Sequence, residues 1–287
     1  MSNIFVFHQG RGDSGWLRYN VFDGSQWAGD TEVPKTGMTG DPSAVVYNNK
    51  IYVFHQGRGD SGWLWYNVFD GSQWAGDTEA PKTGMTAGPS AVVYNDKIYV
   101  FHQGRGDSGW LWYNVFDGSK WAEDKEVGET GITSSPSAVV YNDKIYVFHQ
   151  GRGDSGWLWY NVFDGSQWAG DKEVRDKEVR GTGLTDDPSA VVYNNKIYLF
   201  HEGKGDNGWL WCNIFDGFDW AGDKKVPNTG ITAGPSAVVY NDQIQVFHQG
   251  REDSGWLWCN IFDGSDWVGD RKVSNTGISE GPGAVAY

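Results

Sequence analysis

The chain writes one unit of about 47 residues six times, and this repetition restricts its fold more than any other feature. Close copies of the stretch HQGRGDSGWLWYNVFDG (residues 55–71) recur at steps of 47, 47, 47, 52 and 47 residues. The copies begin at His8, His55, His102, His149, His201 and His248. A fixed period of this length is typical of propellers, solenoids and arrays, in which each unit packs against its neighbours.

Each unit is predicted to be a four-stranded antiparallel meander. In residues 41–87, two apolar runs flank Asn48-Asn49, a pair that tolerates positive φ and favours a two-residue hairpin turn. A glycine-rich loop, residues 57–62, leads to a third strand from Trp63 to Phe69. After the turn signal Asp70-Gly71, we expect the fourth strand to start near Trp74 and to run towards Ala80.

The two ends of the chain favour a closed ring. Residues 3–7 match the second strand of the unit, and residues 282–287 match its first strand, so the last segment supplies the strand that the first copy lacks. Pairing the two ends removes the exposed strand edges that an open array would have to protect. The sequence therefore predicts an all-β, six-bladed β-propeller. The expected blades are 1–40 with 281–287, 41–87, 88–134, 135–186, 187–233 and 234–280.

Composition narrows the classes of partner. The formal net charge of −14 disfavours nucleic acid and anionic membrane surfaces, and no apolar run is long enough to cross a bilayer. No signal peptide is recognisable at the N-terminus, so we expect either a cytoplasmic protein or one released by a non-classical route. The two cysteines, Cys212 and Cys259, replace a repeated tyrosine in neighbouring blades and are expected to be free, packed thiols.

Two departures from strict repetition stand out. Asp-Lys-Glu-Val-Arg is written twice in tandem within residues 171–180, which reads as a duplication in a solvent loop. All 17 tryptophans fall at the three unit positions of Trp63, Trp65 and Trp74, and Arg18 stands where the first copy lacks the middle one. Aromatic side chains in such columns are suited to packing one sheet on the next.

The loops that join strands two and three form the more promising face for a ligand, because function concentrates on loops held by a rigid scaffold. Their polar groups can pair with hydroxyls, and Trp63 or Trp65 can offer a flat apolar surface to a sugar ring. The candidate carbohydrate-binding residues are His8, Arg11, Asp13, Trp16, His55, Gln56, Arg58, Asp60, Trp63, His102, Gln103, Arg105, Asp107, Trp110, His149, Gln150, Arg152, Asp154, Trp157, His201, Asp206, Trp209, His248 and Trp256.

The order of motifs in each unit, Ile-Tyr-Val-Phe-His-Gln, then Leu-Trp-Tyr-Asn-Val-Phe-Asp-Gly, then Trp-Ala-Gly, resembles the repeats of bacterial and fungal β-propeller lectins. The six-bladed fucose-binding lectins hold their sugar between adjacent blades with an arginine and a glutamate. The matching positions look like Tyr52 and Tyr66, so the resemblance implies pockets between blades but not fucose as the ligand. It implies a multivalent lectin that binds glycans on cell surfaces and agglutinates cells.

Other functions stay open at this level. Arg-Gly-Asp-Ser occurs four times, first at residues 11–14, which would fit a cell-adhesion protein, and an idealised repeat scaffold without a ligand is a third possibility. We expect no enzyme, because no blade carries a unique cluster of catalytic residues. No cofactor or required metal is expected, since one aspartate per loop is a poor calcium site. Glu252 replaces a loop glycine in blade six, so blades one to four should bind most alike.

Overall fold

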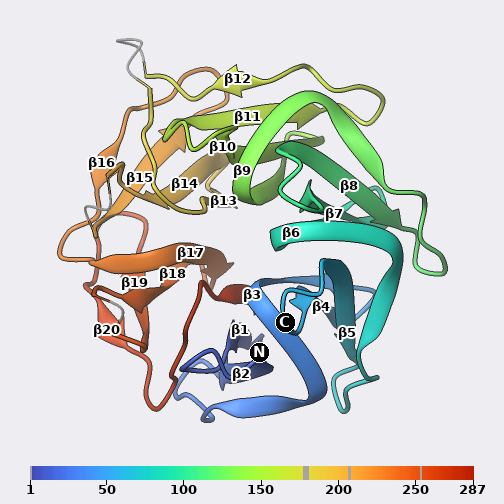
Figure 1. The fold of residues 1–287 in the computed structure, drawn as a ribbon. Coiled ribbons are helices and arrows are strands. Elements are labelled where there is room, and N and C mark those ends of the chain that lie inside the picture. Colours follow the sequence, from blue (N-terminus) through green and yellow to red (C-terminus); the bar gives the residue numbers. More distant parts are fainter. Residues whose placement is uncertain (1, 177–180, 206–207, 253) are drawn as a thin grey trace.

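A computed structural model describes residues 2–176, 181–205, 208–252 and 254–287, and it shows a closed ring of six antiparallel sheets (Figure 1). The described residues contain no helix, and so none that could span a membrane. The predicted six-bladed β-propeller is confirmed.

The blades follow one another around the ring in chain order. Blade one holds β1 (Ile4–Gln9), β2 (Trp16–Phe22), the start of β3 (Thr31–Tyr47) and β21 (Gly283–Ala286). Blade two holds the rest of β3, β4 (Lys50–Gly57), β5 (Trp63–Phe69) and the start of β6 (Thr78–Tyr94). Blade three holds the rest of β6, β7 (Lys97–Gly104), β8 (Trp110–Phe116) and the start of β9 (Lys125–Tyr141).

The other three blades complete the ring. Blade four holds the rest of β9, β10 (Lys144–Gly151), β11 (Leu158–Phe163) and β12 (Lys172–Glu173). Blade five holds β13 (Ser189–Tyr193), β14 (Lys196–Glu202), β15 (Leu210–Phe215) and β16 (Lys224–Lys225). Blade six holds β17 (Ile231–Tyr240), β18 (Gln243–Gly250), β19 (Leu257–Phe262) and β20 (Arg271–Lys272).

The ring closes as the sequence predicts, by pairing of the two chain ends in blade one. Strand β1 pairs antiparallel with β21, and Ile4 lies opposite Ala286. The backbone N–H of Asn3 donates to the carbonyl of Tyr287 over 2.6 Å, and the N–H of Tyr287 donates back to Asn3 over 2.8 Å. Strand β1 therefore has a hydrogen-bonded neighbour on each side, β2 and β21, and no exposed edge.

The local turn chemistry explains the hairpins. Asn48 and Asn49 have φ values of 49° and 58°, which suit the tight turn between β3 and β4. At the next turn, Oδ1 of Asp70 accepts hydrogen bonds from the N–H groups of Ser72 and Gln73, both over 2.8 Å. The predicted start of the fourth strand is wrong: Trp74 only bridges to Phe69, and regular pairing begins at Thr78.

Three long strands run through the expected blade boundaries. β3, β6 and β9 each form the outermost strand of one blade and then continue as the innermost strand of the next. The tandem repeat of residues 171–180 includes β12 at the edge of blade four. Within it Asp176 bridges to Trp220 of blade five, and residues 177–180 lie outside the described part of the chain.

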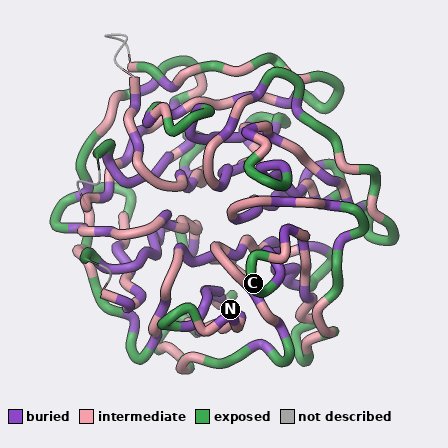
Figure 2. Tube along the Cα trace, viewed as in Figure 1, coloured by how far each residue is buried: buried purple, intermediate pink, exposed green. Residues whose placement is uncertain are grey.

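The core lies in layers between the blades, which Figure 2 shows as buried segments inside a partly exposed rim. Trp74 of blade two packs edge-on against Phe7 of blade one at a ring-centre distance of 5.9 Å. The same contact recurs around the ring, for example between Trp121 and Phe54 at 6.1 Å. Cys212 and Cys259 are free and buried, and burial raises the pKa of both thiols.

Candidate functional site

The six repeated histidines belong to the scaffold and do not face a ligand. Each is fully buried: in blade two, Nε2 of His55 lies 3.0 Å from Oδ1 of Asp77, and Nδ1 lies 3.0 Å from the carbonyl oxygen of Gln56. The equivalent pairs are His8–Asp30, His102–Asp124, His149–Asp171, His201–Asp223 and His248–Asp270. The prediction that these histidines contact sugar is corrected, because no surface of theirs reaches solvent.

The predicted arginine and tryptophan positions do come together, but across blade junctions and on each other. The guanidinium of Arg58 lies 4.4 Å from the ring centre of Trp16, so each cation covers the tryptophan of the preceding blade. The other pairs are Arg105–Trp63, Arg152–Trp110, Lys204–Trp157, Arg251–Trp209 and Arg11–Trp256. In blades five and six, Lys225 and Lys272 also lie over Trp209 and Trp256.

The loop aspartates sit at exposed tips. Asp13, Asp60, Asp107 and Asp154 adopt φ values between 48° and 51°, and their side chains are exposed. The backbone N–H of Asp107 donates to the hydroxyl of Thr86 over 3.3 Å, which ties the loop to the preceding connection. Asp206, also predicted to bind, lies outside the described residues.

Some predicted residues meet in a groove of about 450 Å³ between the loops of blades three and four. Gln103 and Asp107 line it from one blade, and Arg152 and Asp154 line it from the next. Gln103 is largely buried at the base of its loop, as are Gln56 and Gln150 in their own blades. The loop face therefore offers polar side chains from two blades to one shared space.

A larger groove, at the junction of blades one and two, contains the predicted residue Arg58 and the alternative sugar surface Trp65, but its aspartate, Asp77, was missed by sequence reasoning. It has a volume of about 740 Å³ and is lined by Pro34, Lys35, Gly37, Gly57, Arg58, Ser61, Trp65, Trp74, Ala75, Gly76 and Asp77. The available signal was an aspartate that recurs in every copy, 22 residues after the repeated histidine. Its meaning depends on the groove, which only the packing of two blades creates.

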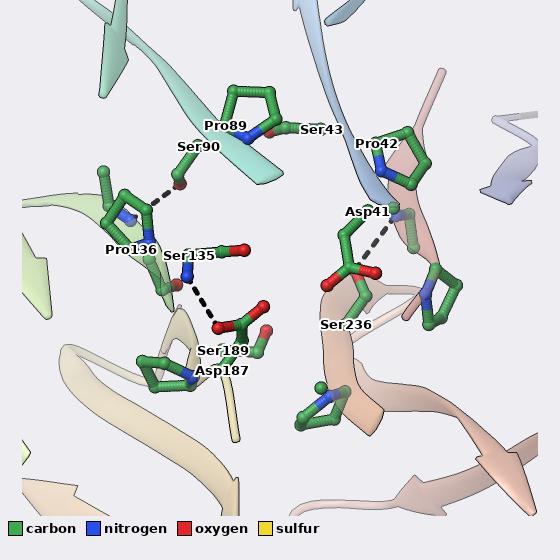
Figure 3. Close-up of a pocket in the computed structure, with 18 of the residues that line it drawn as sticks. Asp41, Pro42, Ser43, Pro89, Ser90, Ser135, Pro136, Asp187, Ser189 and Ser236 are labelled. Carbon is green, nitrogen blue, oxygen red and sulfur yellow. Dashed lines mark hydrogen bonds between the residues drawn. The ribbon is translucent and has the colours of Figure 1, made fainter. Parts of the chain in front are cut away.

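The axial channel is lined by a proline from each blade, followed by a serine in five blades and by Gly283 in blade one (Figure 3). Its serine hydroxyls are already used: Oγ of Ser90 accepts from the backbone N–H of Ala138 over 2.9 Å, and the same link recurs at four other junctions. Burial raises the pKa of Asp41 well above its ordinary value, and the neighbouring Asp187 raises it further. The channel is about 170 Å³ in volume and presents mainly groups that hold the ring together.

Among the described residues, no group of three or more histidine, cysteine, aspartate and glutamate side chains could hold a metal ion. Known family models and curated proteins give no match to the chain. Solved structures give strong matches, so similarity to known proteins is found at the level of the fold.

AofleA from Arthrobotrys oligospora is 13% identical, with a TM-score of 0.69 over 99% of this chain and 88% of that chain. The fucose-specific lectin from Aleuria aurantia is 16% identical, with a TM-score of 0.66 over 96% and 93%. An α-L-arabinofuranosidase from Clostridium thermocellum is less similar, with 15% identity and a TM-score of 0.55 over 84% and 96%. Over nearly its whole length, the chain has the six-bladed fold of the fungal lectin propellers.

Proposed function

We propose that the protein is a multivalent lectin that binds neutral glycans in grooves between adjacent blades. The observation that carries this proposal is the recurrence, around one closed ring, of junctions where aromatic, cationic and carboxylate side chains of two blades meet. Such a mixture of an apolar ring face with a few polar groups is the usual composition of a small-ligand site. The Aleuria lectin of the same fold is solved with α-methyl-L-fucoside, which supports a saccharide as the ligand class.

Charge and repetition favour the same class of partner. A net charge of −14 repels anionic surfaces, whereas it leaves neutral sugars unaffected. Each shallow groove would bind one sugar weakly, but several grooves on a rigid ring increase avidity by roughly 10²–10⁴ on a glycan-coated surface. Glycoconjugates on cell surfaces are the proposed partners, and agglutination of cells is the expected consequence.

The geometry gives less support to adhesion through Arg-Gly-Asp. An adhesion motif has to present its arginine and aspartate together on an accessible loop. Here Arg58 and Asp60 are both exposed, but the guanidinium of Arg58 lies over Trp16 of the neighbouring blade, so its position is set by the blade junction. A linear Arg-Gly-Asp peptide is therefore expected not to inhibit cell binding.

A glycan array tests the proposal, followed by inhibition of red-cell agglutination with free monosaccharides. We expect retention of a defined subset of glycans, agglutination that a monosaccharide from that subset inhibits, and no effect of the linear Arg-Gly-Asp peptide. Retention of no glycan would overturn the proposal and would favour a scaffold without a ligand. Inhibition by the peptide but not by sugars would favour adhesion instead.

A further inference from the structure

The groove between blades one and two contains a carboxylate that is only half used by the protein. Oδ1 of Asp77 is fixed by His55 at 3.0 Å, whereas Oδ2 has no hydrogen-bond or ion-pair partner in the described part of the chain. The Asp77 side chain is 14% exposed and lines the groove. One oxygen thus orients the group, and the other remains available as a hydrogen-bond acceptor.

Trp65 is held in a fixed position beside this carboxylate. Gly57 makes the position possible, because a Cβ atom there would lie 2.7 Å from Nε1 of Trp65 and 2.5 Å from Oγ of Ser61. The same close approach recurs at Gly104, Gly151 and Gly250. The partly exposed indole of Trp65 and the unpaired oxygen of Asp77 give the groove an apolar surface and a strong hydrogen-bond acceptor. Because Trp65 is packed against Gly57, little side-chain entropy is lost when a ligand binds.

Blade one carries the same aspartate as blade two, but in a closed groove. Residues 8–38 and 55–85 differ only at Arg18, which replaces Trp65, and at Val33, which replaces Ala80. The opposite wall of the blade-one groove comes from blade six and has Ser274 and Asn275 in place of Pro34 and Lys35. Nε of Arg18 donates to Oδ2 of Asp30 over 2.8 Å, and its terminal nitrogen lies 3.5 Å from Glu32. The oxygen that is free in Asp77 is therefore occupied in Asp30, and the indole is absent.

We propose that the groove formed by Trp65 and Asp77 binds the vicinal diol of a neutral pyranose, and that blade one is an inactive copy. This inference rests on the proposed lectin function and assigns its saccharide site. A sugar hydroxyl donates to Oδ2 of Asp77, the neighbouring hydroxyl accepts from the cationic rim of Lys35 and Arg58, and the C–H face of the ring lies on Trp65. The corresponding pairs are Trp112–Asp124, Trp159–Asp171, Trp211–Asp223 and Trp258–Asp270.

The insertion alters one copy of this groove. Between blades four and five the corresponding space measures about 310 Å³, and Asp176 of the inserted segment lines it beside Asp223. A second carboxylate there changes both the room and the charge around the expected acceptor. The test therefore uses blades one and two, whose sequences match most closely.

The test counts sugar molecules bound per protein at saturation. The probes are methyl α-L-fucopyranoside, methyl β-D-galactopyranoside and methyl α-D-mannopyranoside, each measured by equilibrium dialysis at millimolar protein concentration. Trp65→Arg copies the closed arrangement into blade two and should lower the count by one. Arg18→Trp should raise it by one, a gain that loss of folding cannot produce. Val33→Ala, the other difference between the blades, is the matched control and should leave the count unchanged.

The possible results separate the two proposals. If the wild-type protein binds glycans but neither Trp65→Arg nor Arg18→Trp changes the count, this groove is not the site, while the lectin function stands. If the wild-type protein binds none of the three probes and no glycan on the array, the lectin function itself fails. Asp77→Asn should also lower the count by one, because an amide replaces the acceptor oxygen pair, and an unchanged count would likewise overturn the assignment.

Discussion

Blades one and two show how one substitution changes the groove wall that each blade supplies. Both keep an identical histidine–aspartate pair, with 3.0 Å between Nε2 and Oδ1 in each. In blade one Arg18 completes a second ion pair with Asp30, whereas in blade two Trp65 leaves that side of Asp77 open. The comparison shows that one position of the repeat, Arg18 or Trp65, decides whether the second carboxylate oxygen is paired, while the histidine–aspartate pair stays the same.

The histidine–aspartate pair is the part that the two blades share, and its removal should have the largest effect. His55→Ala removes a fully buried side chain and its bonds to Asp77 and to the strand, so we expect a loss of about 3 kcal/mol in the free energy of unfolding. His8→Ala should cost about 1 kcal/mol less, because Arg18 still neutralises Asp30. Denaturant unfolding of both variants checks this. Equal costs would mean that Arg18 gives Asp30 no support.

The second difference between the blades concerns packing alone. Val33 is fully buried beside Phe7, Leu17 and Met38, so Val33→Ala should lower the free energy of unfolding by about 1–2 kcal/mol. Thermal unfolding measures this loss, and the same samples report sugar binding. A change in the number of bound sugars would mean that Val33 affects the proposed groove as well as the packing.

The sequence was sufficient for the architecture because its signals can be recognised by comparing one copy of the repeat with another. The period, the Asn48-Asn49 turn and the match between the two chain ends each predict one feature, and each is found in the structure. The site was harder. A histidine next to a glycine-rich loop resembles a residue that contacts a ligand. His55 is instead fully buried and contacts Asp77, which lies outside the strands, 22 residues later. The aspartate recurs 22 residues after the histidine in every copy, but the repetition alone does not show that the two side chains meet.

Contacts between neighbouring blades could not be predicted from the sequence either. Arg58 follows strand β4 of its own blade, yet its guanidinium lies over Trp16 of the blade before it. Repetition gives the residues but not the offset at which neighbouring blades meet, because that offset depends on how the sheets twist and pack. The groove of Trp65 and Asp77 depends on the same offset, since Pro34 and Lys35 of the preceding connection form its other side.

The smallest expected effect isolates the ion pair of blade one. Burial raises the pKa of Asp30, but the hydrogen bond and charge of His8, together with those of Arg18, outweigh burial and hold this pKa below its ordinary value. Asp30 therefore releases its proton more readily in the folded than in the unfolded protein. Its stabilising contribution is complete above about pH 4, where the unfolded chain is also ionised, and it disappears as the pH falls through the folded pKa.

Arg18→Gln removes one of these two partners without adding an indole. Because the Arg18 side chain is 31% exposed, solvent screens the pair, and the expected cost at pH 7 is at most about 1 kcal/mol. The difference from the wild-type protein should shrink in 1 M salt and should disappear as the pH falls through the lowered folded pKa of Asp30. Thermal unfolding at several pH values, with Trp65→Gln as the control in the blade that lacks this arginine, measures it. A pH-independent difference would mean that Arg18 acts through packing, and the closed groove would then be a steric effect rather than an electrostatic one.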